Sequence, residues 1–280
     1  MFKSVFALSM LVSSVALARP LPKNRGWQAD IIAPPSELTA TFDFSGIVAL
    51  SGCSGAIVQF STDVNAKALV LTNGHCVGML DDGPTTVYHN KPYASGVRAF
   101  KNDQTTVSTR TTEILYGMMA PHDLALLQLN VTYKQLADQG VKAFGLDSTP
   151  APVGESIYLA SGYFKDVHQC DVVGIIYRIV EDIWTNENSY KYRDCGSRHG
   201  TSGSPLISAR TNLIIGVNYT GNDAGERCTY NNPCEVDENG NVTVEEGAGY
   251  GDQIYKILTC VNTTGNFDLT VLGCLLPKPN

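Results

Sequence analysis

The feature that most constrains the fold is a series of short, β-rich apolar runs that begins near Phe42 and continues through most of the chain. Clusters of Gly, Asn, Asp and Pro separate the runs, and this spacing is typical of an antiparallel barrel or sandwich rather than of alternating strands and helices. Helical periodicity is confined to residues 133–142 and 252–261. The runs are GAIVQF, KALVLTN, TTVYH, TEILYG, LALLQLN, SIYLASGY, VVGIIYRIV, PLISA, LIIGVNYT and NVTV. The pattern therefore predicts an all-β protein with two short helices.

A Pro-containing break at residues 146–154 divides these runs into two groups. We expect one domain over residues 41–148 and a second over residues 149–280. In the second, Asn239-Gly240 predicts a two-residue hairpin turn, because this pair suits positive φ angles. The oxygen-bearing side chains around it also suggest a calcium loop, but the glycine falls at the wrong position for one.

The beginning of the chain has the composition expected of an export signal. Residues 1–18 (MFKSVFALSMLVSSVALA) start with one Lys, continue through an apolar stretch and end on Ala-Leu-Ala, which predicts a cleaved signal peptide. The apolar stretch is short for a membrane span, and no other segment is long and apolar enough to cross a bilayer. Residues 19–40 are rich in Pro and polar residues and predict a pro-segment or an N-terminal arm. We therefore expect a secreted or periplasmic protein.

Composition excludes several classes of partner. The 280 residues are 43% hydrophobic, which is enough for one large domain or two small ones. A formal net charge of −7 without basic runs argues against nucleic acid binding. An even number of cysteines in an exported chain favours disulfides over metal ligation. The chain also has no C-x-x-C pair of the kind that would suggest a zinc site. The cysteines are Cys53, Cys76, Cys170, Cys195, Cys228, Cys234, Cys260 and Cys274.

Three short segments carry residues that can perform nucleophilic catalysis. His75 lies in LTNGHC, Asp123 in PHDLALL and Ser202 in GTSGSP. A serine hydroxyl is a poor nucleophile until an imidazole accepts its proton, and a carboxylate must orient that imidazole. Glycines beside the serine allow a tight turn whose N–H groups can hold an oxyanion. Each motif alone also fits a structural role, but the three together, in this order, indicate a catalytic triad.

The remaining acidic and histidine candidates lack this context. Polar or loop-like sequence follows the other candidate carboxylates, whereas Asp123 opens an apolar strand. Those other carboxylates are Asp81, Asp82 and Asp103. The other histidines lack both the preceding turn and the neighbouring cysteine, so we interpret them as surface or pocket residues. They are His89, His122, His168 and His199.

These segments resemble those of the chymotrypsin-like serine proteases, and the resemblance extends over roughly residues 44–220. The G-x-S-G-S-P loop is more similar to the bacterial glutamyl endopeptidase branch than to animal trypsins. The resemblance implies two packed antiparallel β-barrels, residues 41–148 and 149–280, with a short C-terminal helix and a disulfide-linked C-terminal extension. It further implies a monomeric, trypsin-like serine endopeptidase that acts on protein or peptide substrates and needs no metal or organic cofactor.

The resemblance also assigns roles to individual residues. His75 would be the general base and then the general acid, Asp123 its orienting carboxylate and Ser202 the nucleophile. The N–H groups of Gly200 and Ser202 would form the oxyanion hole. It implies a Cys53–Cys76 disulfide, whereas the other pairings rest on proximity, because eight cysteines allow 105 arrangements. By proximity we expect Cys228–Cys234 and Cys260–Cys274, which leaves Cys170–Cys195.

Substrate preference is expected to depart from trypsin. The resemblance places the base of the primary specificity pocket at Gly196, followed by Ser197, with Asn218 in place of the histidine of the glutamyl branch. None of these residues carries a charge that would select Arg or Lys. Arg198 and His199 either supply a positive environment or are exposed loop residues. We expect cleavage after uncharged or acidic residues.

Two further sequence features bear on specificity and activation. If Asp194, rather than Gly196, forms the base of the specificity pocket, its carboxylate should select Arg or Lys at the cleaved residue. Thr201 precedes the nucleophile, where trypsin-like zymogens need an aspartate to pair with the freed amino terminus. We therefore expect activation by another route.

Two alternative functions were weighed. An α/β-hydrolase esterase would need a second glycine at Ser204 and a triad that ends in His, so the sequence excludes it. A catalytically inactive, protease-like binding protein on the same scaffold remains the alternative. A fluorophosphonate probe distinguishes the two, because only an active serine enzyme is labelled.

Overall fold

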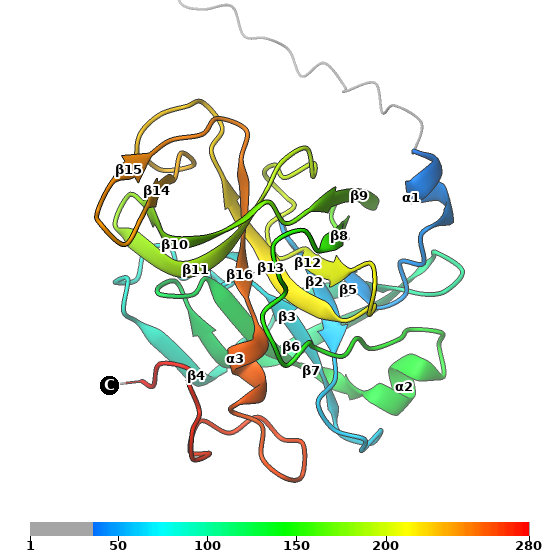
Figure 1. Ribbon diagram of the computed structural model, residues 1–280. Helices are drawn as coiled ribbons and strands as arrows, with labels where there is room; N and C mark the ends of the chain where they lie inside the picture. Colours follow the sequence, from blue (N-terminus) through cyan, green and yellow to red (C-terminus); the bar gives the residue numbers. More distant parts are fainter. Residues whose placement is uncertain (1–35, 280) are drawn as a thin grey trace, which may run out of the picture. The chain divides into compact units, whose positions relative to one another are not determined.

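The computed structural model describes residues 36–279, and these residues form two antiparallel β-sheets with three short α-helices (Figure 1). The expected all-β class is confirmed. The predicted signal peptide and residues 19–35 of the predicted arm lie outside the described residues. Among the described residues, no helix has the length and apolar character needed to cross a membrane.

The first sheet contains seven strands in the order β4-β6-β5-β1-β2-β3-β7. An additional pairing between β6 and β7 closes six of these strands into a barrel. Closure leaves no unpaired edge in the ring, and β4 continues the sheet outside it by pairing with β6. The strands are β1 Ile47–Ala49, β2 Ser54–Val58, β3 Lys67–Thr72, β4 Val87–Pro92, β5 Gly96–Phe100, β6 Thr106–Met118 and β7 Leu124–Thr132.

The second sheet contains nine strands in the order β15-β14-β10-β11-β16-β13-β12-β8-β9. Its strands begin after the predicted boundary at residue 148, and that boundary stays a prediction. The strands are β8 Ser156–Ser161, β9 Asp166–Asp171, β10 Gly174–Glu181, β11 Trp184–Tyr192, β12 Pro205–Ser208, β13 Ile214–Gly221, β14 Cys234–Val236, β15 Val242–Thr243 and β16 Gly249–Gln253.

The predicted hairpin at Asn239-Gly240 connects β14 and β15, but its loop is longer than two residues. Val236 pairs with Val242, so residues 237–241 form the loop. Asp237 Oδ1 accepts the backbone N–H groups of Asn239 at 2.9 Å and Asn241 at 2.8 Å. The Asp237 side chain therefore satisfies the loop backbone and permits the longer turn.

Two of the three helices follow the predicted helical periodicity. Helix α2 (Tyr133–Ala137) and helix α3 (Tyr255–Leu258) lie within the two predicted segments, although both are shorter. Helix α1 (Glu37–Thr41) was not predicted, because five residues are too few to establish a period. Thr39 joins α1 to the second sheet, since its hydroxyl oxygen accepts the backbone N–H of Val167 in β9 at 3.2 Å.

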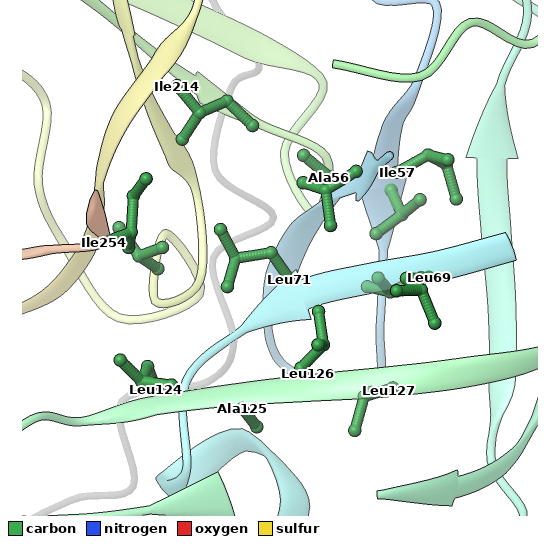
Figure 2. Packing of buried hydrophobic residues seen from close by; sticks show 14 of the residues in the cluster. Ala56, Ile57, Leu69, Leu71, Leu124, Ala125, Leu126, Leu127, Ile214 and Ile254 are labelled. Atoms are coloured by element: carbon green, nitrogen blue, oxygen red, sulfur yellow. The ribbon is translucent and has the colours of Figure 1, made fainter. Parts of the chain in front are cut away.

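The main hydrophobic core fills the barrel and continues into the second sheet. Figure 2 shows side chains of β2, β3 and β7 packed near Ile214 of β13 and Ile254 beside α3. Leu71, Leu124 and Ile214 are each at most 1% exposed. Because β3 and β7 contribute to this shared core, the residues at their ends are held rigidly where the two sheets meet.

Four disulfides cross-link the described residues, and all four expected pairings are confirmed. One of them, Cys170–Cys195, joins β9 to the loop after β11. The pairs are Cys53–Cys76, Cys170–Cys195, Cys228–Cys234 and Cys260–Cys274.

Candidate active site

The register between β3 and β7 brings two of the predicted catalytic residues together. These strands are antiparallel, and Thr72 at the end of β3 pairs with Ala125 at the start of β7. The chain therefore leaves β3 beside the residue that precedes β7. His75 opens the short 3-10 helix η1 (His75–Val77), and Asp123 lies directly before β7.

The His75 side chain is bound to the Asp123 carboxylate. Nδ1 of His75 lies 2.6 Å from Oδ2 of Asp123, and the backbone N–H of His75 donates to Oδ1 at 3.1 Å. Burial lowers the pKa of His75, but the Asp123 carboxylate outweighs this effect, so the pKa is raised above its usual value. The carboxylate thus fixes the ring orientation and favours a proton on Nδ1.

The loop that bears Ser202 is attached to the barrel through its backbone. The carbonyl of Ser202 accepts the N–H of Ser54 at 2.7 Å, at the start of β2. The preceding residue, Cys53, is bonded to Cys76, which follows His75. One short series of contacts therefore connects the predicted nucleophile to the predicted base.

All three predicted triad residues line one cavity of about 210 Å³. The cavity also collects side chains from the loop before Ser202, from β10 and β11, and from the segment after β13. Beyond His75, Asp123 and Ser202 it is lined by Gly52, Cys53, Leu80, Met119, Glu181, Trp184, Ser197, Arg198, His199, Gly200, Asn218, Tyr219, Thr220, Gly221, Asp223, Tyr230 and Asn231.

The predicted oxyanion-hole residues lie in the same loop. Gly200 and Ser202 both line the cavity. Within residues 36–279, neither backbone N–H donates a hydrogen bond. The Gly200 carbonyl instead accepts the Ser54 hydroxyl at 3.1 Å, which holds that end of the loop against β2. Both N–H groups are therefore without a partner among residues 36–279.

Thr201 closes the turn that carries the nucleophile. Its hydroxyl donates to the carbonyl of Arg198 at 2.6 Å and accepts the N–H of Arg198 at 3.0 Å. The side-chain amide of Asn218 donates to the same hydroxyl at 3.1 Å. Uncharged hydrogen bonds therefore hold this loop at the position where trypsin-like zymogens use an ion pair.

The three predicted substrate-binding residues do not all reach the cavity. Ser197 and Asn218 line it, whereas Gly196 is not among its lining residues and packs against the His168 ring. The Asn218 side chain is buried, and its Oδ1 accepts the hydroxyls of Tyr192 at 2.6 Å and Ser197 at 2.8 Å. Asn218 therefore organises the wall of the cavity.

The two cationic candidates near the nucleophile are both paired with acids. Arg198 is bound to Asp166 and stacks over the Phe164 ring at 4.0 Å. His199 is 74% exposed and lies 3.0 Å from Asp223. Asp166 largely offsets the charge of Arg198, and His199 lies beside the Asp223 carboxylate, so neither residue leaves much positive field for an acidic substrate group.

Glu181 is a cavity residue that the sequence analysis missed. It lies at the end of β10, where its Oε1 accepts the N–H of Asn231 at 2.7 Å. Burial raises the pKa of Glu181, and its charge acts on both His75 and Asp123. No motif marks this residue, because a hairpin about 100 residues further along the chain than His75 brings it here.

His122 lies differently from expectation, whereas Asp194, the alternative pocket base, does not reach the cavity. His122 is 2% exposed and is bound on both ring nitrogens, so it is not a surface or pocket residue. Asp194 is exposed and is not among the residues that line the cavity. This position does not favour Asp194 as the base of a specificity pocket.

One cluster has the residue types of a metal site, namely Cys53, His75 and Cys76. The two cysteines are joined in a disulfide, so they supply no thiolate. The imidazole alone remains, and it is already bound to Asp123. The cluster therefore does not fit a metal ion.

Comparison with known proteins places this site in a protease family. No curated protein matches the chain. The apo MamO protease domain from Magnetospirillum magneticum is 16% identical, with 76% of this chain and 94% of that chain covered and a TM-score of 0.49. A Nocardiopsis protease is 14% identical, with 75% and 92% covered and a TM-score of 0.45. Mouse neuropsin, a serine protease, is 16% identical, with 76% and 91% covered and a TM-score of 0.45. Residues 53–217 match the trypsin-like peptidase domain, and because they make up more than half of the chain, it belongs to this family.

Proposed function

We propose that the protein is a secreted serine endopeptidase that hydrolyses peptide bonds through an acyl-enzyme on Ser202. The observation that carries the proposal is the 2.6 Å contact between His75 Nδ1 and Asp123 Oδ2 in the cavity that Ser202 also lines. Export is supported by four disulfides, which persist in oxidising compartments.

The reaction follows from the roles of these groups. Nε2 of His75 takes the proton of the Ser202 hydroxyl as the oxygen attacks the substrate carbonyl. Asp123 stabilises the resulting imidazolium, and the N–H groups of Gly200 and Ser202 hold the oxyanion. His75 then gives its proton to the leaving amine. Water, deprotonated by the same imidazole, attacks the ester and releases the acid with Ser202 restored.

The cavity chemistry favours uncharged side chains at the cleaved residue. Asn218, at the position of the histidine of the glutamyl branch, is neutral, and its Oδ1 accepts the hydroxyls of Tyr192 and Ser197. Glu181 adds negative charge to the same cavity. We therefore infer cleavage after uncharged residues, and neither a strict glutamate preference nor a trypsin-like preference. A peptide library in which cleavage occurs mainly after Glu, Arg or Lys would contradict this inference.

A fluorophosphonate probe tests the proposal directly. The wild-type protein should be labelled on one serine, and Ser202→Ala and His75→Ala should each abolish labelling and hydrolysis while remaining folded. Ser204→Ala is the matched control, because Ser204 lies two residues away, is buried, and its hydroxyl has no hydrogen-bond partner among the described residues. An unlabelled wild-type protein would support the inactive binding protein instead.

A further inference from the structure

A second carboxylate lies directly behind Asp123, the predicted orienting carboxylate of the triad. Asp252 belongs to β16 and has no exposed surface. Its Oδ2 accepts the backbone N–H of Asp123, and its Oδ1 lies 3.1 Å from Nδ1 of His122. The two oxygens thus bind two consecutive residues of the segment that leads into β7.

The protonation of His122 follows from its other neighbour. Nζ of Lys256, in α3, lies 2.8 Å from Nε2 of His122. An ammonium group can only donate, so Nε2 must be the acceptor and carries no proton. The ring proton is therefore on Nδ1, where it is donated to Asp252. Lys256, His122 and Asp252 form a directed series of hydrogen bonds that ends at the backbone of Asp123.

We propose that Asp252, His122 and Lys256, together the Asp252 network, are positioning residues that hold Asp123 in register with His75. The proposal rests on the proposed serine protease function. Asp123 contacts His75 with both carboxylate oxygens, so a small rotation of its backbone would break one of the two contacts. The N–H that Asp252 accepts lies on that same residue.

The energetic character of the network supports a functional role. A fully buried carboxylate beside a neutral imidazole rarely adds net stability over packed apolar side chains, because its charge loses its water. Burial raises the pKa of Asp252, and the hydrogen bond from His122 opposes that rise. Asp123 and Tyr219 also face this carboxylate electrostatically. A buried carboxylate such as Asp252, which costs stability and lies against Asp123, is better explained by a role in positioning Asp123 than by a role in stability.

The decisive experiment exploits the tautomer of His122. In Asp252→Asn, the new NH₂ group faces either the backbone N–H of Asp123 or the Nδ1–H of His122. In both cases two N–H donors point at each other and no hydrogen bond can form. The ring cannot move its proton to Nε2 while Lys256 donates there. We expect the rate of fluorophosphonate labelling and the kcat for a cleaved library peptide to fall about tenfold to a hundredfold, the cost of one charged hydrogen bond. KM should change little, because the network touches no substrate.

The double variant Asp252→Asn, Lys256→Gln supplies the rescue. A Gln amide can accept as well as donate, so His122 can move its proton to Nε2 and accept the new amide at Nδ1. We expect the double variant to regain most of the lost kcat, and Lys256→Gln alone to lose less than about threefold. A merely structural role predicts no such rescue, because the second substitution would add to the damage of the first.

Glu235→Gln is the control for loss of a half-buried carboxylate elsewhere in the second sheet. Glu235 is bound to Lys191 and to the Tyr250 hydroxyl, so its loss should lower the free energy of unfolding but leave kcat unchanged. The inference is overturned if Asp252→Asn keeps the kcat of Glu235→Gln, or if the double variant is no faster than Asp252→Asn. Failure of the wild-type protein to react with the probe would instead overturn the proposed function.

A second pair of variants decides the question if Asp252→Asn does not fold. His122→Asn keeps an N–H donor near the position of Nδ1, and His122→Leu removes it. We expect His122→Asn to retain most of the labelling rate and His122→Leu to lose about tenfold or more at equal fractions folded. Equal rates for the two would contradict the Asp252 network.

Discussion

Gly203→Ala should both destabilise the protein and displace the nucleophile loop. Gly203 follows Ser202 and has a φ of +81°, a backbone conformation that costs a side-chain-bearing residue about 1–2 kcal/mol. A Cβ at this position would also collide with the carbonyl oxygen of Ser54 and the hydroxyl of Thr72, far inside van der Waals contact. The carbonyl belongs to β2 and cannot rotate away.

The magnitude follows from these two costs. Overpacking against a fixed backbone atom typically costs about 1–3 kcal/mol, so Gly203→Ala should lose about 2–5 kcal/mol in total. Relief of the collision requires the loop to move away from β2. That movement would break the 2.7 Å hydrogen bond between Ser54 N and the Ser202 carbonyl and carry the nucleophile away from His75.

Gly240→Ala separates the two costs. Gly240 has a φ of +83°, and no described atom lies within 4 Å of the Cβ position. It should lose only the backbone cost of about 1–2 kcal/mol and keep full reactivity. Urea unfolding gives the free energies, and the rate of fluorophosphonate labelling reports the loop. If the two variants lose equal stability and Gly203→Ala is labelled at the wild-type rate, the reasoning from the contact with Ser54 is wrong.

Three further predictions concern charge, cross-linking and loop order. His75 must be neutral to act as a base, so kcat/KM should fall as the pH drops through the raised pKa of His75. Glu181→Gln removes a negative charge that favours the imidazolium, so the acidic limb of the kcat/KM profile should move to lower pH. A shift of that limb to higher pH would refute the role of His75 as the base. Replacing Cys53 and Cys76, which are 23 residues apart, by Ser should lower the free energy of unfolding by about 3 kcal/mol and slow labelling. The same change at Cys228 and Cys234, which are 6 residues apart, should lower it by about 2 kcal/mol and leave the labelling rate unchanged. Equal labelling rates in the two variants would count against the coupling of His75 to Ser54 through the Cys53–Cys76 disulfide. Thr201→Val should leave polar groups of Arg198 and Asn218 without a partner and cost about 1–3 kcal/mol, with slower labelling; Thr201→Ser, which keeps the hydroxyl, should behave as wild type in both measurements.

The fold was largely predictable because its signals are local. Alternating apolar runs and turn residues identify strands one at a time, and the His75 and Asp123 motifs each adjoin a strand, β3 and β7. Once β3 and β7 pair as antiparallel neighbours, the two residues must meet. Helix α1 escaped prediction because five residues give no period, and the length of the hairpin loop escaped it because the Asp237 side chain decides it.

The surroundings of the site could not be predicted in the same way. Glu181 reaches the cavity through the β10–β11 hairpin, and Asp252 meets Asp123 across 129 residues. Neither residue lies in a pattern that distinguishes it from an exposed carboxylate. His122 illustrates the difficulty, because the sequence places it one residue before Asp123 and yet gives no sign that its side chain faces the interior.

The two kinds of residue also differ in what substitution can reveal. His75, Asp123 and Ser202 act as one unit, so the loss of His75 or of Ser202 should leave a similarly small residual rate and conceal how the others are held. The Asp252 network acts on the orientation of Asp123 alone, so its loss should be partial and, through Lys256, reversible. A graded response at Asp252 beside an all-or-none response at Ser202 would separate the groups that take part in the reaction from those that hold them in place.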